Sequence, residues 1–422
     1  MISFQVAELL RTIRARFDID TLRRRLAPDT APVRSLRPTR GASAAHANRY
    51  WDQLIAQGPA SDADRDAIAD PVSLADAEIY GGNIENFAGT VKLPVGIVGP
   101  LRVRGVNASG DYHIPLATTE AALVASYGRG VQVATRAGGV QAAVLYEGVI
   151  RTPAFRFADL LHSGMFVDWI AGQTDTLASV AEGTTRHGKL LAIDPVIDND
   201  TVFLICRYST GDASGQNMVT IATEALCRHV ADTCPIPIAC WYIEGNFSGD
   251  KKASALGLVT GRGRKVSASV TLPGDLVRSH LGTSVEDMLA YGRVANLGSL
   301  LSGQMGAQAH YANGLAALYI ATGQDAACVA ESAMGFTRME ARGDDLFCAV
   351  TMPNILVGSV GGGTGLPSQS AALRMMGLHG AGHGRALAEI TAALCLCGEI
   401  SIVAAIAAGH FTRAHEKLAR HR

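Results

Sequence analysis

Residues 190–208 read LLAIDPVIDNDTVFLICRY, and this stretch decides the fold class of the chain. It holds two runs typical of β-strands, 190–195 and 201–208. Residues 218–233 follow with the apolar spacing of a helix, and 236–242 return to a strand-like pattern. Strands and a helix mixed within residues 151–243 predict a compact α+β module.

Helix-rich segments flank this module. Residues 1–84 predict helices and polar linkers, before a Gly-rich passage with a short strand. The remaining expected elements are a strand at 93–98, a turn and helix at 115–130, a strand at 266–272, helices at 276–295 and 296–322, and a flexible turn at 361–365. The glycines and alanines of 296–322 let other backbone approach closely, which predicts the central helix of the larger domain.

The composition indicates a soluble enzyme of two or three domains. The chain has 422 residues, of which 48 % are hydrophobic and 18 % charged, so it has ample material for a core and is not disordered. The 37 basic and 38 acidic side chains leave a net charge of -1. This balance argues against a protein that grips nucleic-acid phosphates.

Three segments bear on membranes. Residues 2–10 are short and contain Glu8, so they do not predict a signal peptide. The arginines of 11–25 predict a basic amphipathic helix, which either contacts a membrane or acidic partner or forms a solvated face. Residues 390–409 are almost wholly apolar with Glu399 midway, which predicts a buried central helix rather than a membrane span.

The cysteines and histidines predict neither disulfides nor a metal site. The eight cysteines include no CxxC, and their scatter through apolar segments predicts reduced, buried thiols in a cytoplasmic protein. His379 and His383 form an HxxxH pair without an evident third ligand, so we expect no zinc there.

Standard nucleotide-binding motifs are missing from the sequence. No GxGxxG occurs, which argues against a Rossmann dinucleotide site. The stretch GTTRHGKL at 183–190 resembles a P-loop but has Leu190 where Ser or Thr must hold Mg²⁺. Thr185 and Arg186 remain as a candidate pocket for a lone phosphate.

Several polar segments are ambiguous when each is taken alone. Glu120 ends ATTE before an Ala-rich helix and fits a simple partner of the helix dipole. The run Asp250-Lys251-Lys252 fits either a solvated turn or a clamp for an anion and an oxyanion. Asp325 fits either a helix cap or a buried acid, and His415 lies in the C-terminal tail.

Taken together, eight segments resemble the 3-hydroxy-3-methylglutaryl-CoA (HMG-CoA) reductase family in order and spacing. They are ENFAG at 85–89, PVGIVGPL at 94–101, LATTE at 116–120, GDASGQNM at 211–218, DKK at 250–252, GQD at 323–325, VGGGT at 360–364 and AAGHFTRAH at 407–415. The resemblance covers roughly residues 80–418. Within the family, the sequence is most similar to the long-form class I enzymes, and it resembles a soluble member of prokaryotic type.

The resemblance assigns roles residue by residue. The residues that match the family's catalytic set are Glu120, Lys251, Asp325 and His415. The substrate contacts it implies are Arg151 and Lys252 for the carboxylate, Asn313 at the reacting centre, and the adjoining Asp250 and Glu244. The NADPH contacts it implies are Thr185 and Arg186 at the 2′-phosphate, Asp212 and Asn217 in the dinucleotide loop, and Gly361 and Gly362.

The family fold is α+β. It implies a large helix-rich substrate, CoA and dimerisation domain (85–152 and 244–422) around a long central helix. A small ferredoxin-like, non-Rossmann NADP(H)-binding domain (153–243) is inserted in it, and 1–84 form the N-terminal helical region. The family also implies a homodimer or homotetramer with active sites at the subunit interface. From the charge balance, the apolar segments and the Cys and His spacing, we expect a cytoplasmic protein with neither nucleic acid, membrane nor metal as partner.

The implied reaction is NADPH-dependent reduction of an acyl-CoA thioester to a primary alcohol, with HMG-CoA giving mevalonate and CoA. Each of two hydride transfers creates an oxyanion, which Lys251 can stabilise. We expect Glu120, packed among apolar residues near Asp325, to donate a proton. His415 can protonate the departing CoA thiolate from a terminal flap.

Departures from the family pattern keep alternatives open. Ser214 and Gln216 replace two methionines, and Ser248-Gly249 replace a Cys-Thr/Ser pair. Glu244 replaces a serine; it points away, pairs with a nearby cation, or accepts a hydrogen bond from a different substrate. The alternatives are a diverged paralogue that reduces another carboxylated thioester on CoA or a carrier, and a non-catalytic CoA-binding homologue. The full catalytic set argues against the second.

Overall fold

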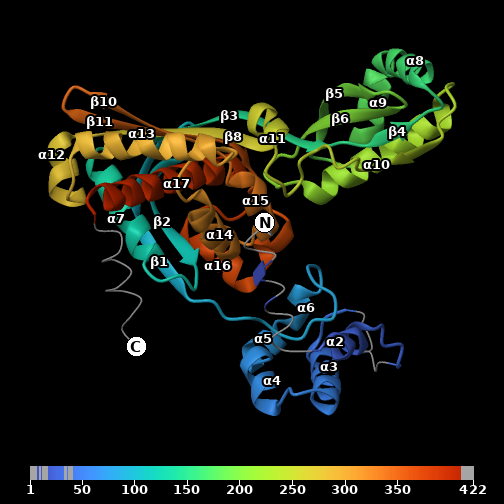
Figure 1. Cartoon of the computed structure of the whole chain (residues 1–422), viewed down its shortest axis with the longest axis horizontal. Helices are drawn as coiled ribbons and strands as arrows, with labels where there is room; N and C mark the ends of the chain where they lie inside the picture. Colours follow the sequence, from blue (N-terminus) through green and yellow to red (C-terminus); the bar gives the residue numbers. More distant parts are fainter. Residues whose placement is uncertain (1–6, 9–10, 12–17, 33–35, 37–40, 410–422) are drawn as a thin grey trace. The chain divides into compact units, whose positions relative to one another are not determined.

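The computed structural model describes residues 7–8, 11, 18–32, 36 and 41–409 (Figure 1). The chain divides into two compact units, Met1–Thr90 and Val91–Arg422.

In the part that the structure describes, the first unit forms short helices, as the sequence predicts. They are α2 (Ile19–Leu26), α3 (Ala44–Gln57), α4 (Asp62–Ile68), α5 (Pro71–Ala75) and α6 (Ala77–Tyr80). Ser43, Ser61 and Asp70 accept hydrogen bonds from the first turns of α3, α4 and α5, which fixes where these helices begin. Of the predicted basic helix at 11–25, the arginines of 12–17 lie outside the described residues.

The described part of the second unit contains one mixed sheet of eleven strands. Its main path runs β7-β4-β6-β3-β8-β11-β10-β9; β1 pairs with β2 and β3, and β5 pairs with β6. The strands are β1 (Val95–Gly105), β2 (Ser109–Ala117), β3 (Val140–Arg151), β4 (Ala154–Arg156), β5 (Lys189–Asp198), β6 (Thr201–Ser209), β7 (Cys240–Tyr242), β8 (Gly263–Leu272), β9 (Gly306–Ala307), β10 (Gly335–Arg342) and β11 (Asp345–Ile355).

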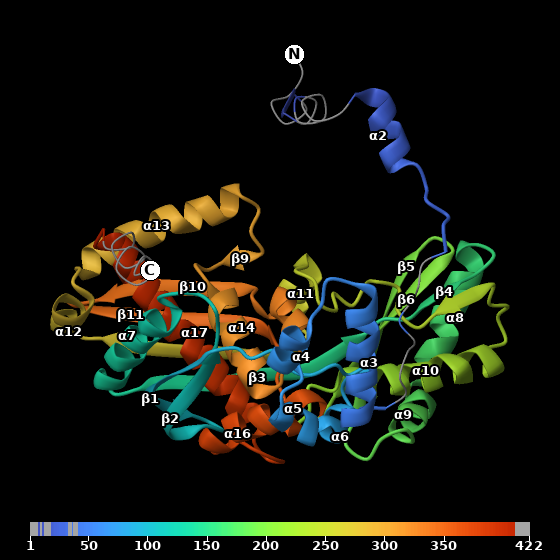
Figure 2. The same ribbon diagram turned by 90° about the horizontal axis from the view of Figure 1, so that it is seen from below.

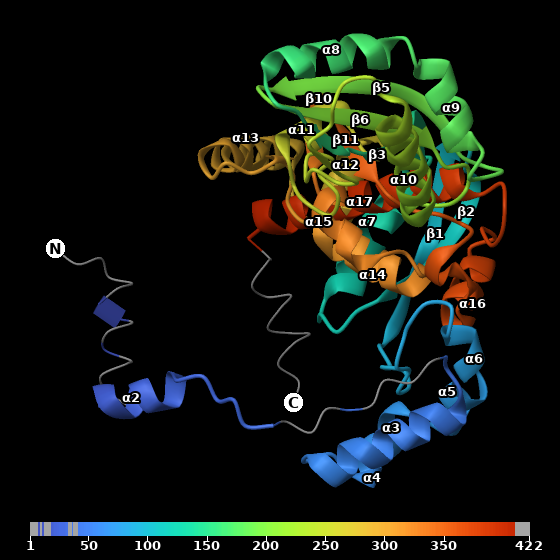
Figure 3. The ribbon, with the colours of Figure 1, turned by 90° about the vertical axis from the view of Figure 1, so that its right-hand side faces the viewer.

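The strands and helices predicted within residues 151–243, the module of the sequence analysis, are present as β4–β7 and three helices. The runs 190–195 and 201–208 lie in the antiparallel pair β5–β6, and 218–233 lie in α10 (Gln216–Thr233). The other two helices, α8 (Leu160–Ala171) and α9 (Thr174–Glu182), pack on β5 (Figure 3). The strand expected at 236–242 is shorter, since only Cys240–Tyr242 pair with β4.

Strand β3 links this module to the rest of the unit. Residues 141–148 pair with β8, and the last three, Val149–Arg151, pair with β6 of the module (Figure 1). Arg151 therefore lies where the two parts of the sheet meet.

The core of the larger part forms around α17 (Gly384–Ala407), which is buried along nearly its whole length. It packs against α7 (Leu123–Arg136), β8, β11 and β3 (Figure 2). A Cβ on Gly130 of α7 would overlap the carbonyl oxygen of Cys397, so these two helices approach at backbone distance. Among the described residues, α17 is the one helix long and apolar enough to cross a membrane, but 83 % of its most apolar window is buried. The buried helix expected at 390–409 is thus confirmed.

The prediction of a single helix at 296–322 is wrong. The chain instead forms α13 (Val285–Leu301), a connection containing β9, and α14 (Tyr311–Thr322). Gly303 and Gly306 adopt positive φ angles of 70° and 101°, which end the first helix. The buried carboxylate of Glu399 accepts hydrogen bonds from the backbone N–H groups of Ala309 and His310 at 2.9 Å, just before α14 begins. The central helix is α17.

The other helical segments connect these elements. They are α11 (Ala255–Thr260), α12 (Gly274–Leu276), a π-helical turn (Val277–Leu281), the 3₁₀ turn Ala326–Cys328, α15 (Val329–Ser332), the 3₁₀ turn Gly362–Gly365 and α16 (Pro367–Met375). The helix predicted at 276–295 is likewise divided, at Gly282 with φ 67°.

Candidate active site

Lys251 and Asp325 form an ion pair. The ammonium nitrogen of Lys251 lies 2.8 Å from Oδ2 of Asp325, and both side chains are about two-fifths exposed, at 43 % and 41 %. Lys251 belongs to a turn after β7, whereas Asp325 precedes α15 and also accepts the Ala327 N–H at 3.0 Å. The pair thus joins two loops at a place that a ligand can reach.

The pairing shifts both pKa values toward the charged forms. The hydrogen bond to Asp325 raises the pKa of Lys251 above its ordinary value, against the opposite effect of burial. Burial acts to raise the pKa of Asp325, but the Lys251 hydrogen bond and the Ala327 N–H outweigh it and lower that pKa. A fixed positive charge is therefore available at neutral pH.

Glu120 and Asn313 form a second pair. The amide nitrogen of Asn313 donates to both carboxylate oxygens of Glu120, at 3.1 and 3.0 Å. Glu120 lies between β2 and α7, and Asn313 lies in the first turn of α14. Glu120 is exposed, which corrects the expectation that apolar residues surround it.

The expectation that Glu120 lies near Asp325 is not met within one chain. Asn313, the partner of Glu120, lies near the start of α14, and Asp325 follows its end at Thr322. The helix rises about 14 Å between Asn313 and Thr322 at the usual rise per residue. The structure therefore presents two separate pairs of candidate residues, here called half-sites, Lys251–Asp325 and Glu120–Asn313, toward opposite ends of α14.

Three of the predicted substrate contacts meet at Arg151. Its Nη1 lies 3.2 Å from Oε2 of Glu244 and 3.1 Å from Oδ2 of Asp250, and its Nη2 donates to Thr220 Oγ1 at 3.0 Å. Arg151 is buried, and its Nε has no hydrogen-bond partner. Glu244 thus pairs with a cation rather than pointing away. Lys252 stays exposed and donates to the carbonyl oxygen of Asp250 at 2.8 Å.

Arg262 and Glu331, which the sequence analysis missed, lie under the lysine turn. Each side chain is only 1 % exposed, and Nη1 of Arg262 donates to both oxygens of Glu331 at 2.7 and 2.8 Å. Burial raises the pKa of Glu331, against the opposing effect of the Arg262 charge. Arg262 directly precedes β8, and the burial that makes a partner for its charge necessary is visible only in the folded chain.

Two departures from the family pattern belong to the same network. Oε1 of Gln216 accepts a hydrogen bond from Nη2 of Arg262 at 2.6 Å. The buried hydroxyl of Ser248 accepts the N–H of Asp250 at 3.2 Å. Both substitutions therefore have a structural reason.

Some of the residues expected to contact the dinucleotide lie close together. The carboxylate of Asp212 accepts the N–H groups of Gly382 and Gly384, at 2.7 and 3.0 Å, and so holds the start of α17. Burial acts to raise the pKa of Asp212, but these two bonds outweigh it and lower the value. Ala213 and Val360 form a β-bridge, which brings Gly361 and Gly362 beside this loop.

The expected phosphate pocket lies in the loop before β5. Thr185 Oγ1 accepts the N–H groups of His187 and Gly188, at 3.2 and 3.3 Å, and donates to the sulfur of Met218 in α10 at 3.0 Å. Arg186 is exposed beside it, and Asn217 is exposed in the first turn of α10. His415 lies outside the described residues.

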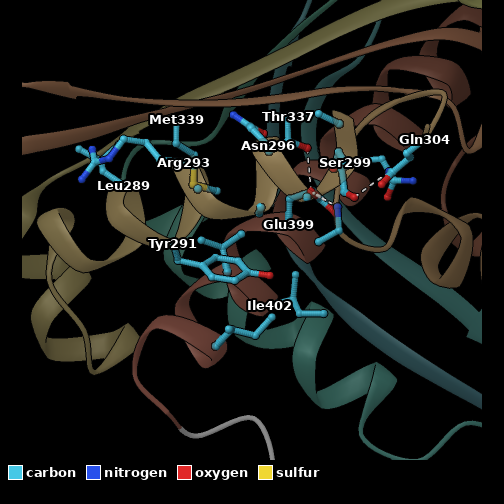
Figure 4. Close-up of a pocket in the computed structure, with 18 of the residues that line it drawn as sticks. Leu289, Tyr291, Arg293, Asn296, Ser299, Gln304, Thr337, Met339, Glu399 and Ile402 are labelled. Carbon is cyan, nitrogen blue, oxygen red and sulfur yellow. Dashed lines mark hydrogen bonds between the residues drawn. The ribbon is translucent and has the colours of Figure 1, made fainter. Parts of the chain in front are cut away.

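A cavity of about 420 Å³ lies elsewhere, between α13, α17 and β10 (Figure 4). Glu399 faces it and accepts the hydroxyl hydrogen of Thr337 at 2.7 Å. Of the described residues, those that line it include none of the predicted catalytic ones. No group of three or more His, Cys, Asp or Glu side chains suited to a metal ion occurs in the part of the chain that the structure describes.

Comparison with known proteins places the chain in a family. The sequence model described as hydroxymethylglutaryl-coenzyme A reductase matches residues 52–420. The 3-hydroxy-3-methylglutaryl-coenzyme A reductase of Methanothermobacter thermautotrophicus is 46 % identical over 341 residues, 80 % of this chain and 85 % of that protein. The enzyme of the same name from Aeropyrum pernix is 44 % identical over 349 residues, 81 % and 83 % of the two chains.

A solved structure shares the fold. The class II 3-hydroxy-3-methylglutaryl-CoA reductase of Streptococcus pneumoniae, bound to NADPH in open conformations, superposes with a TM-score of 0.62 at 19 % identity. The match covers 85 % of this chain and 96 % of that one.

These matches define the class of the protein, an oxidoreductase of mixed α+β fold. The chain belongs to the hydroxymethylglutaryl-coenzyme A reductase family.

Proposed function

We propose that the chain reduces HMG-CoA to mevalonate and CoA, with NADPH as the hydride donor. Two hydrides from two NADPH and two protons convert the thioester into the primary alcohol and the free thiol. The observation that carries the proposal is the Lys251–Asp325 pair at 2.8 Å, beside the buried Arg151 cluster. Family membership supports the same reaction.

Lys251 supplies positive charge to the carbonyl oxygen. Each hydride transfer turns that oxygen into an oxyanion, first in the hemithioacetal and then in the alkoxide, and a fixed cation stabilises both. Asp325 holds the ammonium in place and keeps it protonated, since its hydrogen bond raises the pKa of Lys251. His415 is the proposed proton donor to the CoA thiolate, and Glu120 to the alkoxide.

Asp325→Asn tests this pairing. The variant should lower the pKa of Lys251, because it removes the main cause of the raised value and leaves the opposite effect of burial. Lys251 then loses its proton at lower pH, so the alkaline limb of the kcat profile should move to lower pH. Asp111→Asn, which breaks the exposed pair with Arg102, is the control and should leave that limb in place. An unmoved limb in Asp325→Asn would contradict the role.

The two half-sites support an active site shared between two copies of the chain. Proton donation by Glu120 requires it near the substrate carbonyl, where Lys251 lies, yet α14 separates the two residues within one chain. A second copy that brings its Glu120–Asn313 pair to the Lys251 turn completes the site. We therefore propose a homodimer, or a tetramer of such dimers, in the cytoplasm.

The module at 153–243 is the proposed NADP(H)-binding domain, ferredoxin-like and inserted in the substrate domain. The family resemblance supports this division and that of residues 85–152 and 244–422. α10 begins after Gly215 with φ 77° and has no side-chain cap, so its first N–H groups are free to bind a phosphate. Gly361 and Gly362, at positive φ with open space around them, leave room for a bound dinucleotide.

Arg186→Ala tests where the module binds NADPH. A guanidinium binds a phosphate through two hydrogen bonds and has no such partner on the ribose hydroxyl of NADH. The KM for NADPH should therefore rise much more than the KM for NADH, measured by steady-state kinetics. Equal rises for the two cofactors would show that the 2′-phosphate binds elsewhere.

Arg151 and Lys252 are the proposed contacts of the substrate carboxylate. Glu244 already pairs with Arg151, and this observation favours a second candidate, reduction of a different acyl thioester whose end donates a hydrogen bond to Glu244. NADPH oxidation with a panel of acyl-CoAs separates the two. We expect the highest kcat/KM for HMG-CoA. A clearly higher value for an acyl group with a neutral or cationic end would show that this thioester, and not HMG-CoA, is the substrate.

A further inference from the structure

The backbone of Lys251 is held in a conformation that L-residues rarely adopt. Its φ is 57°, and it lies in a turn closed by the Lys252 N–H, which donates to the Gly249 carbonyl at 3.0 Å. A positive φ at this place of a turn favours glycine or asparagine. Strain of this kind persists only where the surrounding contacts fix it.

One buried carboxylate fixes the turn at this residue. The backbone N–H of Lys251 donates to Oε1 of Glu331 at 3.1 Å, and the Glu331 side chain is 1 % exposed. Glu331 belongs to α15, six residues after Asp325. The same short segment therefore binds both ends of Lys251, its ammonium group through Asp325 and its backbone through Glu331.

Arg262 holds Glu331 from the opposite side. Besides its two bonds to Glu331, the guanidinium donates from Nε to the carbonyl of Ile150 at 3.3 Å and contacts Asp250 Oδ1 at 3.0 Å through Nη2. The hydrogen bond to Gln216 completes the set. Because the guanidinium is a rigid planar fork, these contacts leave neither Arg262 nor Glu331 free to rotate.

We propose that Arg262 and Glu331 are positioning residues, which hold the Lys251 backbone in its left-handed conformation and so direct the ammonium at Asp325 and the substrate oxygen. The inference rests on the proposed function, since turnover is its readout. Wild-type activity is therefore measured first: no reduction of any acyl-CoA would remove the proposed function, whereas the variants below bear on the positioning role alone.

Glu331→Gln should lower kcat by about 10- to 100-fold, as expected for a catalytic group displaced by about 1 Å. In the variant an NH₂ donor replaces one carboxylate oxygen. In place of Oε2 it faces the Arg262 Nη1 donor, and in place of Oε1 it faces both that donor and the Lys251 N–H. The KM for NADPH should stay unchanged, because the substitution displaces the Lys251 turn, which faces the carbonyl group of the acyl substrate. A kcat equal to wild type would overturn the proposal.

A double-mutant cycle separates positioning from general stability. If Glu331 acts through Lys251, Glu331→Gln should cause no further loss of kcat in a Lys251→Ala background. Additive losses would show that Glu331 acts independently of Lys251. Glu389→Gln is the matched control, because that buried carboxylate accepts the Asn107, Ala108 and Val144 N–H groups and has no bond to the lysine turn. It should lower Tm and leave kcat unchanged.

Arg262→Lys carries the same test if Glu331→Gln does not fold. An ammonium keeps the charge beside Glu331 but cannot also reach Gln216 and Ile150. The same fall in kcat is expected, and wild-type kcat in this variant would overturn the proposal.

Discussion

Lys251→Ala is expected to lower turnover of HMG-CoA by about 10²–10³-fold while NADPH still binds, because only the developing oxyanion loses its partner. The ammonium makes its ion pair with Asp325 at the surface of the candidate site, so its removal leaves the buried Arg262–Glu331 pair in place. The measurements are kcat from NADPH oxidation and the Kd of NADPH from its fluorescence.

Lys265→Ala is the control for Lys251→Ala, because it removes an equal charge from β8. It should retain wild-type turnover. If Lys251→Ala keeps more than about a tenth of that turnover, the loss is far below the range for a lost oxyanion partner, and Lys251 does not have this role.

Arg262→Met is expected to lower the free energy of unfolding by about 3–5 kcal/mol, because it leaves the carboxylate of Glu331 buried without its counter-charge. Asp250 would keep only Arg151 as a cationic partner. Urea unfolding of wild type and variant measures the difference.

Arg102→Met is the matched control for that stability prediction. Its guanidinium makes two hydrogen bonds to Asp111 at 2.8 Å, but both side chains are nearly half exposed, and exposed pairs contribute little to stability. If Arg262→Met costs no more than Arg102→Met, Arg262 is not the buried structural charge that the geometry indicates.

Local periodicity predicted the elements whose form depends on their own residues. Residues 190–208 carry enough β-branched and apolar side chains to form β5 and β6 wherever the module lies. Residues 390–409 were predicted as a buried helix because Glu399 makes a membrane span costly, and α17 confirms it.

The break between α13 and α14 depends on contacts that are distant in sequence. Glycine and alanine at 298–312 are compatible with a closely packed helix and equally with a connection. What decides between them is Glu399, whose carboxylate binds the Ala309 and His310 N–H groups, together with the pairing of β9 and β10. Neither partner can be identified from the segment itself.

The candidate site, too, could be predicted only in part from the sequence. The family resemblance named Lys251, Asp325, Glu120 and Asn313, and the structure joins them as two pairs. The sequence did not indicate that α14 separates these two pairs. The order of residues along the chain does not tell which of them meet in the fold. Arg262 and Glu331 were missed because their only signal is burial, which depends on the folded strand and helix around them.

The stoichiometry of the reaction tests the central claim most directly. Purified protein is incubated with HMG-CoA and excess NADPH, and NADPH oxidation, free thiol and mevalonate are measured in the same sample. The account predicts two NADPH oxidised for each CoA thiol released, with one mevalonate formed. No oxidation of NADPH, or one NADPH per thiol with release of the aldehyde, would contradict it.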